Sequence, residues 1–330
     1  MPSATIQFLP YYSRRLLFWF VAGASLAYGA ERKTFTLEGE LRPAPRFSFS
    51  NIAAVGQAFH ASAPVYWDGK FKYKNLTPGQ YSVVIYVPRM GEFRQTYSIG
   101  PATADKKGRV KISVLIHPSR ASRIYTPKDR FTVPVQRLSI PDKARKELAE
   151  AHKKLRKNDR DGAVVHLERA TELAPQYASA WNALGTISYQ RSKFVEAEEY
   201  FREAMRQDPD SFEPVVNLGG ALLSQNRAKE AVAVNQDAVK RRPKDALANS
   251  QLGLSYLETG NTEMAERHLA EAKRLDPGHF SNPQIYLSQI YFKRVQKQAA
   301  AAELEHYLRH HPESKDAEQI REAIRKFRTP

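Results

Sequence analysis

Residues 181–209 read WNALGTISYQRSKFVEAEEYFREAMRQDP, and this pattern returns along the chain at an almost constant interval. The final proline of the stretch has four counterparts, and the five are separated by 34, 34, 34 and 35 residues. They are Pro175, Pro209, Pro243, Pro277 and Pro312. A period of this length predicts an array of helical hairpins, because such a unit buries its apolar face only by stacking on the next.

Small residues recur inside each period. When every proline is numbered as place 32 of its repeat, places 20 and 8 are small in all five copies. These residues are Ala163, Ala197, Ala231, Ala265 and Ala300 at place 20, and Ala151, Gly185, Gly219, Gly253 and Ser288 at place 8. Small side chains let two antiparallel helices approach closely, and proline ends the second helix because it lacks the amide hydrogen.

Larger residues are expected to fill the seam between the two helices at place 24. Four copies are apolar there, namely Leu167, Phe201, Leu269 and Leu304, whereas the third copy has Asn235. The whole pattern resembles the tetratricopeptide repeat, whose template is matched by Trp181, Leu184, Gly185, Ala197, Phe201, Ala204 and Pro209. The resemblance implies an all-α, right-handed superhelix of five repeats over residues 142–313. A capping helix is expected over residues 314–330.

In this family the first helices of the repeats line a concave groove that holds a protein partner or a peptide segment. The corresponding places hold Leu148, Leu155, Asn182, Tyr189, Val216, Leu223, Leu254, Leu257, Ile285 and Phe292. Most are apolar, so an apolar extended or helical ligand is expected, and no clamp for a terminal carboxylate. The alternative is that these residues pack against neighbouring repeats or the capping helix.

The net charge of +16 is unevenly distributed along the chain. Residues 141–330 contain 31 Lys and Arg against 28 Asp and Glu, whereas residues 1–140 contain 20 against 7. The repeats are therefore nearly neutral. Any electrostatic partner should be sought on the first 140 residues.

Residues 1–30 have the features of an export signal. Arg14 and Arg15 precede an apolar run over residues 16–27, and small residues suit cleavage near Ala27 or Ala30. The run is shorter than the roughly 20 residues of a membrane span, so we expect no integral membrane span after cleavage. An uncleaved anchor and a twin-arginine signal are the alternatives. We expect an exported protein, either periplasmic or secreted.

The sequence contains no cysteine. Attachment of a lipid through cysteine, disulfides, thiol catalysis and thiolate metal sites are therefore not expected. Stability outside the cytoplasm would have to come from packing alone.

Residues 31–137 have a different character, with short alternating apolar runs broken by proline and glycine. Such runs predict about seven strands, the last an edge strand at residues 131–133, and hence a small all-β sandwich. A linker at residues 138–141 would join it to the repeats, which makes the chain multi-domain. The order of strands between residues 43 and 66 is not determined by the pattern.

The segment 68–81 is the most specific part of this region. It resembles the strand, Pro-Gly turn and strand of the carboxypeptidase regulatory-like, transthyretin-like sandwich. In that interpretation the segment is a hairpin, in which Pro78 presets the turn, Gly79 adopts the positive φ of a type II turn, and Tyr81 starts the return strand.

Basic residues gather on two of the expected strands. They are Lys70, Lys72, Lys74, Lys106, Lys107, Arg109 and Lys111. Solvated lysines that discourage edge pairing are one interpretation, and a surface for an anionic envelope polymer is the other. Nucleic acid is not expected as a partner, because the aromatic residues alternate with the lysines as core residues do.

Catalytic motifs are not found among the nine histidines and the carboxylates, so we expect no enzyme, no catalytic residues and no cofactor. His306 and His310 are four residues apart on an expected helix, a spacing that could hold a metal ion. A solvated helix end is the preferred interpretation, so no metal site is expected.

Two functions remain open. The first is an exported protein-interaction scaffold of the bacterial cell envelope, which binds a partner through the groove of the repeats. The second is an accessory protein that binds an envelope polymer or carbohydrate through the basic sandwich, with the repeats as a spacer.

Overall fold

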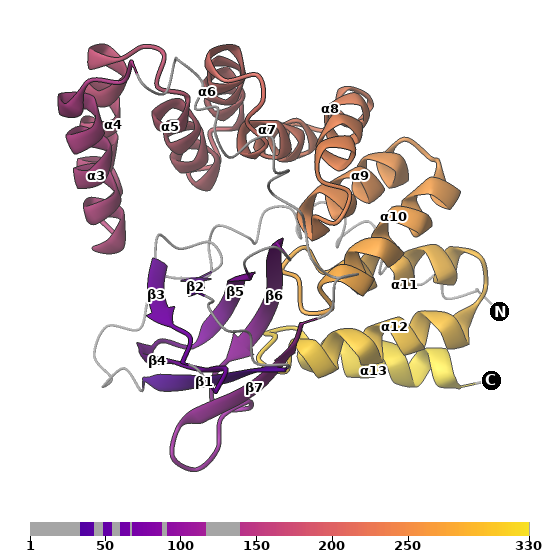
Figure 1. The fold of residues 1–330 in the computed structure, drawn as a ribbon. Coiled ribbons are helices and arrows are strands. Elements are labelled where there is room, and N and C mark those ends of the chain that lie inside the picture. The colour runs from indigo at the N-terminus through magenta and orange to yellow at the C-terminus, as the bar shows by residue number, and fades with distance from the viewer. Residues whose placement is uncertain are drawn as a thin grey trace.

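The structure is a computed structural model that describes residues 34–42, 49–54, 60–66, 68–87, 91–116 and 139–329. The expected export signal at residues 1–30 and the expected edge strand at residues 131–133 lie outside these ranges. The strands form a two-sheet domain within residues 34–116, and the helices form a helical array over residues 139–329. The array curves around the two-sheet domain (Figure 1).

Seven strands are found in the described residues: β1 (Phe35–Arg42), β2 (Phe49–Ala54), β3 (His60–Pro64), β4 (Lys70–Leu76), β5 (Gly79–Val87), β6 (Gly91–Ile99) and β7 (Arg109–Leu115). One sheet has the strand order β4-β1-β7 and the other the order β3-β2-β5-β6. β1 pairs with β7 in parallel, and the other neighbours are antiparallel.

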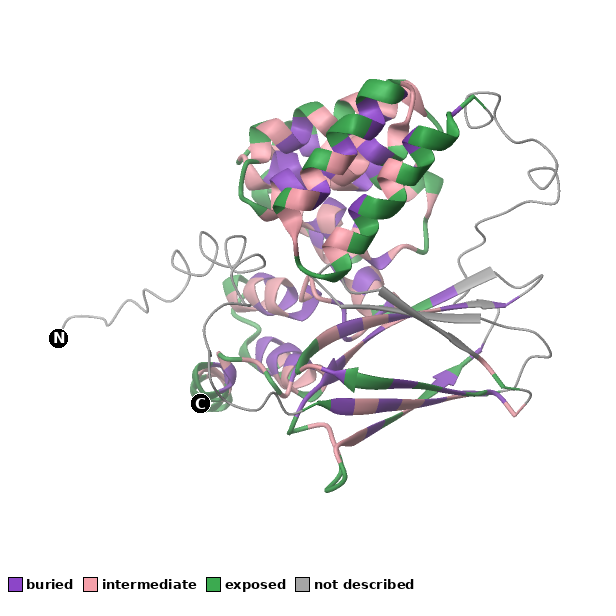
Figure 2. Ribbon diagram, turned by 90° about the vertical axis from the view of Figure 1, so that its left-hand side faces the viewer, coloured by how far each residue is buried: buried purple, intermediate pink, exposed green. Residues whose placement is uncertain are grey.

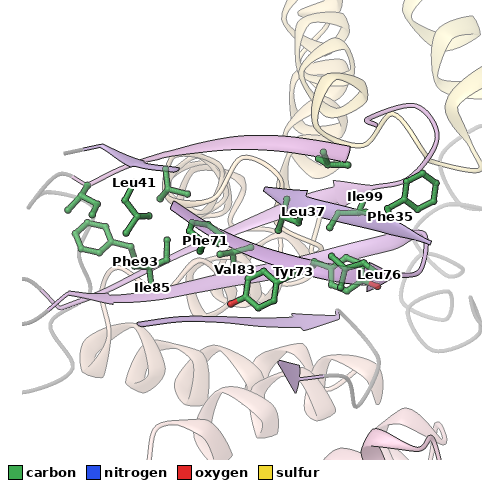
Figure 3. Packing of buried hydrophobic residues seen from close by; sticks show 14 of the residues in the cluster. Phe35, Leu37, Leu41, Phe71, Tyr73, Leu76, Val83, Ile85, Phe93 and Ile99 are labelled. Atoms are coloured by element: carbon green, nitrogen blue, oxygen red, sulfur yellow. The ribbon is translucent and has the colours of Figure 1, made fainter. Parts of the chain in front are cut away.

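Alternate residues of both sheets share one hydrophobic core. Along β1 the buried positions alternate with half-exposed ones, as the two-residue period of a strand requires. The cluster takes residues from both sheets, including Leu37 and Phe71 from one and Val83, Ile85 and Phe93 from the other (Figure 3). The two sheets therefore stabilise each other by burying their facing apolar side chains.

The expected hairpin over residues 68–81 is wrong, because β4 and β5 belong to different sheets. The turn at Pro78 and Gly79 carries the chain from one sheet to the other. The positive φ expected at Gly79 is found instead at Asn75, where φ is 58°. The Tyr81 hydroxyl donates to the Thr77 carbonyl at 2.9 Å across this corner. Leu76 and Tyr81, which lie on either side of this corner, both belong to the shared core.

The helical array contains eleven helices within residues 139–329. They are α3 (Asp142–Arg156), α4 (Arg160–Leu173), α5 (Ala178–Gln190), α6 (Phe194–Gln207), α7 (Glu213–Ser224), α8 (Ala228–Arg241), α9 (Ala246–Glu258), α10 (Thr262–Leu275), α11 (Pro283–Lys293), α12 (Lys297–His310) and α13 (Ala317–Arg328). They pack as five consecutive hairpins followed by α13, and the buried residues face the seams between helices (Figure 2).

The small residues at place 8 have the expected role. A Cβ atom on Gly185 would lie 2.6 Å from the Phe201 ring, and one on Gly253 would lie 2.7 Å from Leu269 Cγ. Gly219 makes the same approach to Asn235. Place 8 of each first helix thus receives the place 24 side chain of the second helix, so the register is confirmed.

The last helix covers the end of the array. Ile320, Ile324 and Phe327 of α13 pack with Leu304 and Tyr307 of α12. The helix begins at Ala317, so Ser314 lies before its N-cap. No helix among the described residues has the length and apolar character needed to cross a membrane.

Candidate partner-binding surfaces

In the second and third repeats the first helices, α5 and α7, lie on the inner side of the arc, nearer the two-sheet domain than α6 and α8 (Figure 1). α5 and α7 are joined there by two side-chain hydrogen bonds. The Asn217 amide donates to Asn182 Oδ1 at 3.0 Å, and the hydroxyls of Tyr189 and Ser224 lie 3.0 Å apart. This inner face of α5, α7 and α9 is therefore more polar than the sequence suggested.

The inner face continues onto α9 and α11. Gln251 lies over the backbone of Gly220, where a Cβ atom would be 2.7 Å from Gln251 Nε2. Burial raises the pKa of Tyr189, and burial followed by the charge of Glu258 raises the pKa of Tyr286 to about 12. These phenols therefore stay neutral and act as hydrogen-bonding groups at neutral pH.

The residues expected to line the groove divide into two groups. Those in the first group are half-buried on the first helices, namely Leu148, Leu155, Asn182, Tyr189, Leu254 and Leu257. The apolar members of this first group also pack against core clusters of the array. In the second group, Val216 and Leu223 are buried, Ile285 packs against the α12–α13 cluster, and Phe292 stacks on Phe327 with ring centroids 4.9 Å apart. A role of the first group in binding stays a prediction.

Carboxylates interrupt the basic residues of the three-stranded sheet. The register places Glu38 of β1 between Lys72 of β4 and Lys111 of β7, and Glu40 opposite Lys70. Lys72 Nζ lies 2.7 Å from Glu38, and this hydrogen bond is the main cause that lowers the pKa of Glu38. The carboxylates of β1 thus neutralise the middle of the sheet.

Two further cations are paired within their own turns. Lys70 lies 2.7 Å from Asp68, and Arg109 lies 2.8 Å from Asp105. Lys74, Lys106 and Lys107 are exposed. This arrangement matches the interpretation of solvated strand lysines better than that of a surface for a polyanion.

The two-sheet domain meets the last two repeats at a junction that the sequence pattern did not predict. Asp276, the residue before the proline that ends the fourth repeat, is 1% exposed. Its carboxylate accepts from the Thr96 backbone N–H at 2.9 Å and from the Thr96 hydroxyl at 2.7 Å. A Cβ atom on Gly278 would lie 2.5 Å from the Thr96 carbonyl oxygen, so the two backbones are in close contact.

The next repeat makes the equivalent contact. His311, which precedes the proline of the fifth repeat, is hydrogen-bonded through Nδ1 to the side-chain amide of Gln80. Glu313 accepts from the backbone N–H of Ala102 at 2.5 Å. The junction is therefore formed by strands β5 and β6 and the following turn against the loops that end α10 and α12.

The pKa values of the junction reflect its burial. Burial raises the pKa of Asp276 to about 6, although the hydrogen bonds from Thr96 oppose this change. Burial lowers the pKa of His279, in the α10–α11 loop, to about 3, and nearby Arg94 adds to the effect. Burial also lowers the pKa of His311 to about 3.

Metal binding has no support from the geometry of the described residues. They contain no group of three or more His, Asp or Glu side chains that could hold a metal ion. His306 and His310 have ring centroids 4.7 Å apart, and His306 Nδ1 lies 3.2 Å from Gln284 Nε2. Burial lowers the pKa of both histidines.

Comparison with known proteins concerns the helical array. Residues 146–276 match the family model described as the cilia and flagella-associated protein 70 middle TPR-like domain. Anaphase-promoting complex subunit 6 of Arabidopsis thaliana is 27% identical over 140 residues, which are 37% of this chain and 25% of that protein. Type IV pilus assembly protein PilF of Pseudomonas aeruginosa is 27% identical over 144 residues, which are 41% of this chain and 56% of that protein.

Among solved structures, that of Pseudomonas aeruginosa PilF aligns with a TM-score of 0.48 and 19% identity, covering 56% of this chain and 89% of that chain. The matched segments span only 25%, 12% and 10% of the first three curated relatives. The activities and partners in the names of these relatives therefore belong to those proteins.

The consecutive hairpins of residues 139–329 define a helical-repeat protein. The repeat places and the match of residues 146–276 to a TPR-like family model together show that the helical array is similar to tetratricopeptide-like repeats.

Proposed function

We propose that this chain is an exported scaffold of the bacterial cell envelope that binds a segment of a partner protein on the inner face of its repeats. The observation that carries the proposal is the mixed character of this face on α5, α7 and α9. Half-buried Tyr189, Leu254 and Leu257 offer apolar surface, while the amides of Asn182 and Asn217 keep further hydrogen-bonding capacity. Such a face suits a peptide segment, which has apolar side chains and a polar backbone.

Export rests on the sequence features of residues 1–30. The similarity to a type IV pilus assembly protein is compatible with a place in the envelope. N-terminal sequencing of the mature protein tests the proposal, with a first residue expected between 28 and 31. Recovery of the protein with an intact Met1 in the membrane fraction would mean that the segment is an anchor.

The two-sheet domain is proposed to be an accessory sandwich of the carboxypeptidase regulatory-like type. Its support is the pair of sheets around one core and the Pro-Gly corner that joins them. Because such a fold alone carries no chemistry, we assign it a structural role and propose no enzymatic activity for the chain.

The binding surface is tested by a charge placed on the inner face of the full-length protein. Leu254→Arg should abolish retention of an envelope partner by immobilised protein, since a buried cation is costly without a counter-ion. Val195→Arg is the matched control, because Val195 lies on the second helix α6 and is 63% exposed. Equal retention by both variants would contradict the assignment.

The second candidate, polymer binding by the two-sheet domain, makes the opposite prediction. Retention would survive Leu254→Arg and be lost in moderate salt, because contacts between exposed charges are screened. The carboxylates of Glu38 and Glu40 among the lysines argue against it.

A further inference from the structure

Two histidines are buried where the two-sheet domain meets the array. His279 is 3% exposed and His311 is 2% exposed. His279 follows Gly278, whose backbone contacts Thr96, and His311 contacts Gln80 directly. The His311 imidazole therefore lies at the contact between domains, where separation of the domains would return it to water, and the His279 imidazole lies in the loop that carries the neighbouring contact.

Both rings are arranged to be neutral. The Nδ1 atom of His311 accepts from the Gln80 amide, and the Nδ1 atom of His279 accepts from the Ser281 backbone N–H at 3.2 Å. Protonation of His311 Nδ1 would set it against the N–H donor of Gln80, whereas His279 Nδ1 also lies 2.6 Å from the Ser281 hydroxyl, which can accept from a protonated ring. The Nε2 atom of His311 is buried and has no hydrogen-bond partner among the described residues.

The charged groups that act on the two rings are all cationic or potentially cationic. Arg94 of β6 and His311 act on His279, and His306 and His310 of α12 act on His311. The one buried carboxylate of the junction, Asp276, is occupied by Thr96 and interacts with Arg94. The other junction carboxylate, Glu313, is exposed and bonded to the Ala102 N–H. Among the described residues, neither histidine ring has a hydrogen bond to a carboxylate that would pair with an added proton.

We propose that this junction is an acid-opened clasp, in which proton uptake by His279 and His311 releases the two-sheet domain from the last two repeats while both parts stay folded. The proposal goes beyond the binding of a partner and does not depend on it. Release would break the contacts of Thr96 with Asp276, of Gln80 with His311 and of Ala102 with Glu313.

The direction of the pH effect follows from the pKa values. The histidines have pKa values of about 3 in the closed state and near 6.5 once exposed, so their stabilising effect is present above pH 6.5 and lost as pH falls. Asp276 acts in the opposite direction, because its closed-state pKa of about 6 exceeds the ordinary 3.8. It takes up one proton in the closed state below pH 6.

Opening should therefore be coupled to about one proton net below pH 6.5, because the protons that the two histidines take up are partly offset by the one that Asp276 loses. The ratio of open to closed molecules should rise about tenfold per pH unit between pH 6.5 and pH 5.

The absence of cysteine makes the experiment direct, since two cysteines can be introduced and labelled in the full-length protein. Lys74→Cys and Ala302→Cys place a fluorescent pair on exposed positions of the two-sheet domain and α12. Energy transfer should fall between pH 7.5 and pH 5 while the far-UV circular dichroism of the helices stays constant. An unchanged transfer efficiency would overturn the proposal.

The variant His279→Gln with His311→Gln removes the titrating groups. It should hold the transfer efficiency constant over the same pH range, whereas the matched control His166→Gln with His268→Gln, whose rings contact Glu147 and Asn249 within the array, should keep the transition. A transition that persists unchanged in the first variant would overturn the proposal.

The His279→Gln, His311→Gln variant could fail to form the junction at any pH. A measurement on the unsubstituted chain then tests the proposal instead. Nuclear magnetic resonance titration should show two imidazoles that stay neutral until the domains separate and then titrate together with the fall in transfer. Titration of all nine histidines near pH 6.5 at constant transfer would contradict the clasp.

Discussion

The seams inside the helical array and the junction with the two-sheet domain are both buried, yet they use different chemistry. A seam sets a glycine against an apolar side chain, as Gly185 against Phe201. The junction sets Thr96 against the ionisable Asp276 beside two histidines. The stability of the seams should therefore not depend on pH. The stability of the junction depends on hydrogen bonds and on ionisable groups whose protonation changes in acid, so it should depend on pH.

Overpacking a seam should have the largest effect. Gly185→Leu adds a side chain where even a Cβ atom would lie 2.6 Å from Phe201, so the free energy of unfolding of the array should fall by about 1 to 3 kcal/mol or more. Thermal denaturation measures the change. Val195→Leu on the exposed face of α6 is the control, and equal melting temperatures for the two variants would contradict the packing.

Removal of one hydroxyl from the junction should weaken the contact between the two domains without unfolding either of them. Thr96→Val deletes the donor that lies 2.7 Å from Asp276 and leaves part of a buried carboxylate unsatisfied, at a cost of about 1 to 3 kcal/mol. Hydrogen exchange should rise at the backbone amides of residues 276–282, while the melting temperature of the array changes little. Thr36→Val, on β1 away from the junction, should change neither quantity.

The third repeat offers a stabilising substitution. Asn235 is fully buried at place 24; its amide donates to Ser255 at 2.9 Å, but its Oδ1 atom has no partner among the described residues. Asn235→Leu restores the residue type of the other seams and should raise the free energy of unfolding by about 1 kcal/mol. The reverse change, Leu269→Asn, is the matched control and should lower the melting temperature. A lower melting temperature for Asn235→Leu would show that the amide is needed there.

The smallest effect is expected on the surface of the three-stranded sheet. Glu38→Gln breaks the ion pair with Lys72, and because such exposed pairs contribute little, the free energy of unfolding should change by less than about 1 kcal/mol. Urea denaturation at low and high salt tests this expectation. A loss comparable to that of Gly185→Leu would mean that the charges of β1 organise the sheet.

The array could be predicted from the sequence because its contacts repeat. Gly185, Gly219 and Gly253 occupy one place in three copies, so each copy supports the interpretation of the others. The two-sheet domain offered no repetition, and the turn at Gly79 was wrongly assigned because a Pro-Gly pair indicates a turn without indicating which sheets it joins. The inner face was only partly predicted, since the pairing of Asn182 with Asn217 depends on the superhelical approach of α5 and α7.

The junction could not be predicted at all. Its partners occur once each, and Thr96 and Asp276 are 180 residues apart in the sequence. Nothing in the pattern around Asp276 distinguishes it from Asp208, which occupies the equivalent place two repeats earlier. The neutralisation of the strand lysines could not be predicted for the same reason, because Glu38 is brought next to Lys72 and Lys111 only by strand pairing.

This separation along the chain also sets an order of events during synthesis. The seams join residues within one repeat or between neighbours, so they can form as each hairpin leaves the ribosome. The bond between Gln80 and His311 spans 231 residues, and contacts of such long range form slowly. The two-sheet domain is made first, but its docking can be completed only after the fifth repeat has been made. A chain truncated before Asp276 should therefore contain a folded two-sheet domain that lacks its junction partners in the array.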